Sequence, residues 1–145
     1  MATTLTLEQM KQFVRDHFED FVNKRNAAVI RKNMTSDFHD HDGPGGKPTG
    51  VDGDEQMMLN MYKAMPDLQL TIEEMIAEGD KVVTRLTSFG KHEGDLPNAP
   101  ATGNEMEMTS ITIHRIADGK LVEKWSEKDM IRMLHQIGVM KPRGG

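Results

Sequence analysis

Proton transfer near neutral pH is the chemistry for which this sequence has the most suitable side chains. Two of its six histidines, His41 and His92, are candidates, as is the carboxylate of Asp129. An unperturbed histidine titrates at about pH 6.5, and an apolar pocket can raise the pKa of an aspartate toward neutrality. Each residue also has a structural interpretation: the histidines can be hydrogen-bonded or exposed, and Asp129 can cap a helix that runs to His135. The residues alone leave both interpretations open.

A metal site is the second chemistry that the histidines suggest. His39 and His41 would share one face of a strand, and with His92 they could supply three ligands. Alternate histidines beside aspartates need no metal to be soluble, and three ligands must converge in space, so we expect no metal. The sequence has no cysteine, which excludes disulfides, thiolate nucleophiles and zinc–cysteine sites.

The length and charge of the chain exclude further classes of protein. Its 145 residues suit one domain, 1–145, with a core over about 6–140 and a short flexible C-terminal tail. The net charge of −5 and the lack of a basic run argue against nucleic acid as a partner. No apolar run approaches the roughly 20 residues that cross a bilayer, and the N-terminus lacks the features of a signal peptide. We therefore expect a cytoplasmic protein that does not bind membranes.

The pattern of apolar residues predicts helices first and long strands afterwards. Apolar residues recur at helical spacing over 10–22 and 54–65, with a shorter helical piece over 27–32. Between them, the glycine- and proline-rich segment 43–53 predicts an exposed loop at the rim of a pocket. The 13 methionines fit ordinary core positions or an adaptable pocket, and the core interpretation is the more economical.

Strand patterns occupy the second half of the chain. Residues 68–72 alternate, 81–90 reads as their antiparallel partner, and a long hairpin begins at Glu105. A closing helix follows from Asp129. This order predicts an α+β domain in which the N-terminal helices pack on one face of a curved antiparallel sheet.

Six motifs in a fixed order resemble the SnoaL-like polyketide and ester cyclases. They are Asp37-Phe38 with His41-Asp42, Met65-Pro66-Asp67-Leu68, Phe89-Gly90-Lys91-His92-Glu93-Gly94, Pro100-Ala101-Thr102-Gly103, Arg115-Ile116-Ala117-Asp118-Gly119-Lys120-Leu121, and Glu123, Trp125 and Asp129 before Gln136-Ile137-Gly138. The resemblance implies the cone-shaped fold of the nuclear transport factor two-like superfamily. It also implies a small-molecule pocket, without a cofactor or a metal.

The sequence departs from the pattern of this family at the catalytic position. In the cyclases, an aspartate directly after the tryptophan is taken as the acid/base of an aldol closure, assisted by a histidine on the preceding strand. This chain has Ser126 and Thr112 there, and a serine hydroxyl has no proton-transfer pKa near neutrality. Asp129 is the nearest carboxylate that could replace the missing one. The predicted site is therefore catalytic Asp129 and His92, with ligand-binding His41, Thr112, Trp125 and Ser126.

The register of the last hairpin decides where Ser126 points. A three-residue loop of 117–119 would put Ser126 on the same face as Thr112, whereas a two-residue Asp118-Gly119 turn would put it with Ile111 and Ile113. The sequence does not choose between these registers.

Two functional hypotheses follow. The first is a protein that binds a small apolar, carbonyl-bearing molecule and acts as a cofactor-independent cyclase, isomerase or hydrolase. The alternative, favoured by the serine at position 126, is a non-catalytic binding or dimerisation module. The resemblance also implies a homodimer that associates through the outer face of the sheet.

Overall fold

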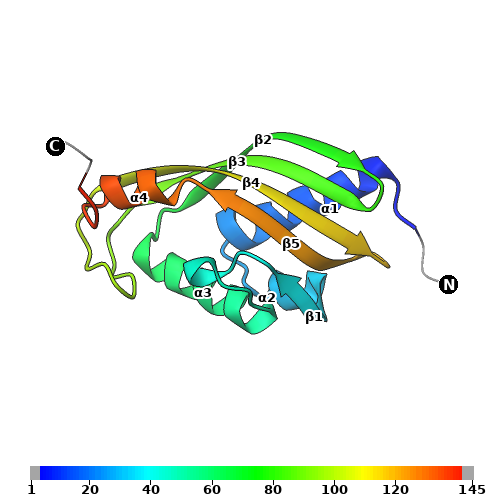
Figure 1. Cartoon of the computed structure of the whole chain (residues 1–145), viewed down its shortest axis with the longest axis horizontal. Coiled ribbons are helices and arrows are strands. Elements are labelled where there is room, and N and C mark those ends of the chain that lie inside the picture. Colours follow the sequence, from blue (N-terminus) through cyan, green and yellow to red (C-terminus); the bar gives the residue numbers. More distant parts are fainter. Residues whose placement is uncertain (1–3, 142–145) are drawn as a thin grey trace.

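The computed structural model describes residues 4–141 of the chain. Within them, five strands form one open sheet, and helices α1, α2 and α3 lie on the same side of it (Figure 1). No helix among these residues is long and apolar enough to cross a membrane. Of the predicted C-terminal tail, residues 142–145 lie outside the described part of the chain.

The helices begin and end close to the predicted positions. The first, α1 (Leu7–Phe18), starts with a capping box in which the Gln9 backbone N–H donates to Thr6 Oγ1 and Thr6 N–H donates back to Gln9 Oε1. It continues as a π-helical turn, Glu19–Asn23. The others are α2 (Ala28–Asn33), α3 (Val51–Ala64) and α4 (Met130–Gln136).

The sheet confirms the predicted α+β fold and adds one parallel strand. Its strands are β1 (Met34–Asp40), β2 (Gln69–Glu78), β3 (Lys81–Lys91), β4 (Glu105–Ala117) and β5 (Lys120–Lys128), in the order β1-β5-β4-β3-β2. The pairs among β2, β3, β4 and β5 are antiparallel, as predicted, whereas β1 runs parallel to β5. From the sequence, only His39 and His41 were placed on a strand face, because most side chains of β1 are polar and only Met34 and Phe38 are buried apolar residues.

The hairpin between β4 and β5 combines parts of both predicted registers. Its turn has two residues, Asp118 and Gly119, with φ angles of 52° and 73°, and this left-handed pair is the type that two-residue hairpins prefer. Arg115 then pairs with Glu123 and Ile116 with Leu121, so Val122 is an extra residue in β5. This bulge reverses the face of the later residues and places Ser126 opposite Thr112.

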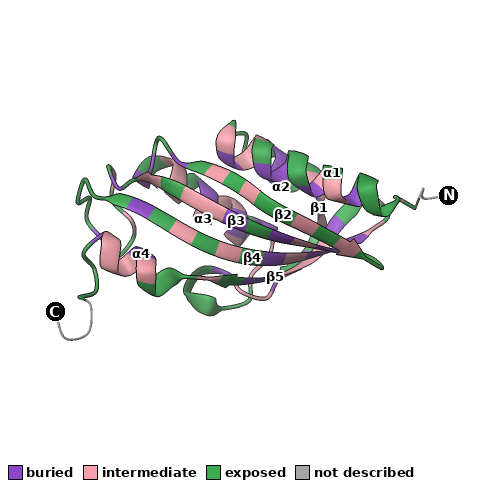
Figure 2. Cartoon of the chain, turned by 90° about the horizontal axis from the view of Figure 1, so that it is seen from above, coloured by how far each residue is buried: buried purple, intermediate pink, exposed green. Residues whose placement is uncertain are grey.

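The two faces of the sheet differ in burial along β3, β4 and β5 (Figure 2). The face toward the helices, called the inner face here, carries buried apolar residues, including Val82, Leu86, Met106 and Ile116. They pack with Val14 and Phe18 of α1 in one buried cluster. Six methionines belong to this cluster, so the core interpretation of methionine accounts for about half of the 13: Met10, Met34, Met58, Met65, Met106 and Met133.

Deleting Val122 should unfold the protein. Without the bulge, every later residue of β5 moves to the opposite face, which turns Ser126 outward and Trp125 into the core. We expect the deletion to cost more than about 4 kcal/mol, the range of exceptional single changes, measured by thermal unfolding followed by circular dichroism. The matched control is deletion of Gly45, which lies in an exposed turn with no neighbour within 4 Å of its position for a Cβ. A deletion variant that melts at the wild-type temperature would contradict the assigned register.

Candidate functional site

Three hydroxyl groups lie side by side across the middle of the inner face. Thr84 of β3 pairs with Thr112 of β4, and Thr112 pairs with Ser126 of β5. All three residues are buried, and no hydroxyl of the three has a hydrogen-bond partner among the described residues. A buried polar group without a partner costs about 1–3 kcal/mol. This hydroxyl row is therefore suited to hydrogen-bond a bound molecule or water, and poorly suited to a dry core.

A buried ion cluster lies beside the hydroxyl row. Lys124 precedes Ser126 by two residues on the same face of β5, and its Nζ lies 3.1 Å from Asp40 Oδ2 and 3.6 Å from Asp54 Oδ2. Asp40 ends β1, and Asp54 lies in the first turn of α3. The carboxyl groups of Asp40 and Asp54 are at most 5% exposed, and the Lys124 side chain is 13% exposed. Two carboxyl groups thus share one ammonium group away from solvent.

The pKa values of the two buried carboxyl groups shift in opposite directions. For Asp54, loss of solvent raises the pKa to about 7; the Lys124 ammonium opposes this rise, and the neighbouring Asp40 carboxylate adds to it. For Asp40, burial also favours the neutral form, but Lys124, Asp54 and the Asp42 backbone N–H together hold its pKa below the usual value. One positive charge needs one negative partner, so Asp40 stays ionised and Asp54 exchanges a proton near neutral pH.

Two buried histidines complete the polar interior. His114 of β4 pairs with Lys124, and His17 of α1 lies with its ring centroid 6.2 Å from that of His114. Burial, with a contribution from Lys124, lowers the pKa of His17 to about 3 and that of His114 well below 6.5. Both rings are therefore neutral at pH 7. Asn33 Nδ2 lies 2.9 Å from His17 Nδ1 and donates to it, whereas His114 Nδ1 has no partner in the part of the chain that the structure describes.

The structure divides the predicted ligand-binding residues between the two faces of the sheet. Thr112 and Ser126 lie together on the inner face, as described above. Trp125 lies on the outer face, where its ring stacks on His41 with centroids 4.8 Å apart and planes 5° from parallel. His41 Nε2 also lies 2.6 Å from Glu123 Oε2. His41 and Trp125 are therefore not brought together with the two hydroxyl residues.

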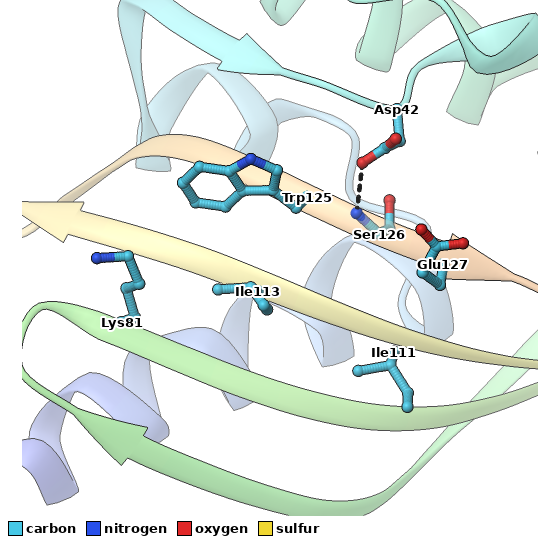
Figure 3. A pocket seen from close by; sticks show the side chains of 7 residues that line it. All are labelled: Asp42, Lys81, Ile111, Ile113, Trp125, Ser126 and Glu127. Atoms are coloured by element: carbon cyan, nitrogen blue, oxygen red, sulfur yellow. Dashed lines mark hydrogen bonds between the residues drawn. The ribbon is translucent and has the colours of Figure 1, made fainter.

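Trp125 lines an open pocket of about 440 Å³ on the outer face (Figure 3). Ile111, Ile113 and Lys81 form its floor and one side. Asp42 lies at the opposite side and accepts a hydrogen bond from the Ser126 backbone N–H, 2.8 Å long. This bond fixes the backbone of Ser126 while its hydroxyl points to the other face.

The two predicted catalytic residues lie away from the ion cluster and from each other. Asp129 is exposed and caps α4, because its Oδ1 accepts from the Arg132 backbone N–H at 3.1 Å. The capping interpretation of Asp129 is therefore confirmed. His92 is fully buried after β3; its Nδ1 lies 3.1 Å from Thr102 Oγ1, and its Nε2 has no partner among residues 4–141.

Sequence reasoning did not find Asp40, Asp54 and Lys124. An acid in the first turn of a helix, such as Asp54, is ordinary helix chemistry, and Asp40 was read only as part of a polar run. Lys124 is recognisable as an inner-face residue only when the register of the β4–β5 hairpin is known. The available signal was the alternation of Lys124, Ser126 and Lys128, which is unusual for a strand next to a core.

The three-histidine metal arrangement is not assembled. The rings of His39 and His41 lie 4.3 Å apart by their centroids, while His92 is held by the loop that follows β3. In the described range, no three His, Asp or Glu side chains form a group that could hold a metal ion.

Comparison with protein families gives a match over most of the chain. The family described as SnoaL-like polyketide cyclase matches residues 12–137. Comparison with curated protein sequences gives no match.

Solved structures with the same fold include three proteins from Streptomyces. AclR, a proposed hydroxylase from Streptomyces galilaeus, has a TM-score of 0.85 and 24% identity over 94% of this chain and 85% of its own. TsrD from Streptomyces laurentii has a TM-score of 0.83 and 25% identity, over 94% of this chain and 100% of its own. IdmH, a proposed polyketide cyclase from Streptomyces antibioticus, has a TM-score of 0.78 and 28% identity, over 90% of this chain and 99% of its own.

Replacing Lys124 by methionine should strongly destabilise the protein. The change keeps the apolar stem but leaves two buried carboxyl groups without a counterion, a loss that typically costs about 3–5 kcal/mol. Urea unfolding at pH 7 measures it. The control is Lys24→Met, because the Lys24–Asp20 pair is exposed and such pairs contribute about 0–1 kcal/mol. Equal losses in the two variants would contradict the role of Lys124 as the shared counterion.

Proposed function

Because this chain belongs to the SnoaL-like polyketide cyclase family, we propose that it binds a small apolar, carbonyl-bearing molecule at the inner face of its sheet. There it moves a proton on that molecule without a cofactor. The observation that carries this proposal is the buried Asp40–Asp54–Lys124 cluster beside the hydroxyl row. Strongly perturbed carboxyl groups next to unpaired hydrogen-bonding atoms are typical of sites that transfer protons.

In this proposal Asp54 is the acid/base. A carboxyl group with a pKa of about 7 is partly ionised at neutral pH, so its carboxylate can take a proton from the carbon next to a carbonyl group. The electrons of the broken C–H bond move to the carbonyl oxygen and form an enolate. The protonated Asp54 then returns the proton, or the enolate carbon attacks a second carbonyl group of the same molecule and closes a ring.

The enolate oxygen needs hydrogen-bond donors and a positive charge nearby. The hydroxyls of Thr112 and Ser126 have no competing partner, so they are free to donate to it. Lys124 lies close to Asp54, so its positive charge also favours the negative charge of an enolate formed beside Asp54. Fixed donors and charges of this kind supply a large share of catalysis in buried sites. Serine at position 126 then has a role as a donor, although it cannot replace an aspartate as a base.

Replacing Asp54 by asparagine should abolish catalysed proton exchange. We expect wild-type protein in deuterated buffer to exchange the α-hydrogens of 1-tetralone, an apolar bicyclic ketone, with a rate that rises with pH through about 7, because the ionised carboxylate is the base. Asp54→Asn should lower the catalysed rate by at least about 100-fold, measured by mass spectrometry of the ketone.

Asp129→Asn is the matched control, because asparagine caps a helix as well as aspartate does. This variant should keep both the stability and the exchange rate of the wild type. Loss of exchange in Asp129→Asn together with normal exchange in Asp54→Asn would contradict the proposal and restore Asp129 as the acid/base.

A non-catalytic binding module is the second candidate, and the observation that favours it is the serine at position 126. Ser126→Asp tests it, since the new carboxyl group would lie opposite Thr112 on the inner face. Ring closure of anthracycline-type ester precursors by this variant but not by the wild type would support a cyclase that has lost its activity. If the variant remains folded and closes no ring, that origin is disfavoured.

We also propose a homodimer formed through the outer face of the sheet. Ile76, Val83, Ile113 and Trp125 are neighbours on four adjacent strands and form an apolar row across that face. Ile76 is 60% exposed, and a contiguous apolar row that reaches solvent is typical of an association surface.

Ile113→Lys should convert a dimer into a monomer, because a buried ammonium without a partner opposes association. Light scattering at micromolar concentration measures the mass of both proteins, and Gln12→Lys, at an exposed position of α1 on the other side of the sheet, is the control. A monomeric wild-type protein would remove this part of the proposal.

A further inference from the structure

Lys128 is a second inner-face lysine that the proposed function does not use. It is the last residue of β5 and pairs with Ser110, and it follows Lys124 and Ser126 at every second position. Its side chain therefore points to the same side of the sheet as the ion cluster and the hydroxyl row.

Lys128 differs from Lys124 in its partners. Lys124 approaches two carboxyl groups, whereas Lys128 forms no ion pair with any of residues 4–141. The Lys128 ammonium donates one hydrogen bond to the backbone oxygen of Asp42, at 3.4 Å, which is long for such a bond. Lys128 is thus a partly buried amine whose one hydrogen bond within residues 4–141 is long and made to an uncharged oxygen.

The surroundings of Lys128 favour the neutral amine. Burial lowers its pKa, and the nearby Lys124 ammonium lowers it further; Asp40, Asp54 and Asp42 oppose this change without cancelling it. Desolvation together with a neighbouring cation is the arrangement that activates lysines for attack on carbonyl groups. A surface lysine, by contrast, is almost fully protonated at pH 7.

We propose that Lys128 is a nucleophile that forms an imine with the carbonyl group of the molecule bound at the inner face. This inference rests on the proposed function and narrows its substrate class to aldehydes and ketones, including 1,3-diketones. An ester carbonyl alone does not give a stable imine.

The reaction is balanced without an oxidant or a reductant. The Lys128 nitrogen attacks the carbonyl carbon, and proton transfer gives a carbinolamine. The neutral form of Asp54 supplies a proton to the departing hydroxyl group, so water leaves and the C=N bond forms. The Asp54 carboxylate that remains can then remove the neighbouring C–H proton and give an enamine, the nitrogen analogue of the enolate.

Labelling with 2,4-pentanedione tests this role directly. A 1,3-diketone condenses with an amine to a conjugated enaminone, which absorbs in the near ultraviolet and increases the mass by that of the diketone less one water. At pH 7 we expect peptide mapping to find the label on Lys128 first, and several-fold faster than on Lys91, because a lowered pKa increases the fraction of free amine. Lys91 is exposed.

Lys128→Arg separates a nucleophile from a loop anchor. Arginine can keep the hydrogen bond to Asp42 but forms no imine under these conditions, because its guanidinium stays protonated. The variant should melt like the wild type and lose the rapid phase of labelling, and Lys91→Arg should keep that phase. Should Lys128→Arg fail to fold, the peptide map of the wild type still decides.

Equal labelling of Lys128 and Lys91 in the wild type would overturn the inference, as would an unchanged rapid phase in Lys128→Arg. The two proposals fail separately. If Asp54→Asn loses proton exchange while Lys128 is not labelled preferentially, the proposed acid/base stands and the imine does not. If Lys128 is labelled first while Asp54→Asn keeps normal exchange, the acid/base assignment fails and the nucleophile stands.

Discussion

The ammonium group of Lys124, which two buried carboxyl groups share, determines how the interior of this protein is charged. Asp40 and Asp54 both approach it, and one positive charge can balance only one of them in a poorly solvated site. The other carboxyl group, that of Asp54, must therefore hold a proton until the pH approaches neutrality. The raised pKa of Asp54 is the result. The neutral forms of His17 and His114 have the same origin, because burial and the charge of Lys124 both oppose their protonation. The protonation states of these groups therefore follow from burial and from the charge of Lys124.

The position of Lys124 depends in turn on the backbone of the last hairpin. The two-residue turn at Asp118 and Gly119 would by itself send Ser126 to the outer face, and the extra residue Val122 returns it to the inner one. The same bulge therefore places Lys124, Ser126 and Lys128 on the inner face and Trp125 on the outer face. The parallel strand β1 then brings Asp40 beside Lys124. The site thus depends on three backbone features: a two-residue turn, one inserted residue and one parallel strand pair.

Much of the fold could be predicted from the sequence, and much less of the site. Helical periodicity over 10–22 and the strand pattern of the final hairpin are strong local signals, and the structure confirms both. The parallel pairing of β1 with β5 was not predicted, because most side chains of β1 are polar and give no clear strand pattern. Thr112 and Ser126 were predicted to lie in the site on the basis of family resemblance, and they are neighbours. Asp54 was missed because its burial depends on tertiary packing, whereas its sequence context is that of a common helix start.

Titration of the Asp54 carboxyl carbon by nuclear magnetic resonance tests the central claim most directly. With Asp54→Asn used to assign the signal, the account predicts a transition near pH 7 in the free protein. The Asp40 signal should remain that of a carboxylate through the same range, since its pKa is lowered. A transition of Asp54 near pH 4, the ordinary value for an exposed aspartate at about 3.9, would contradict the account. It would mean that the interior is well solvated and that Asp54 is not a neutral-pH acid/base.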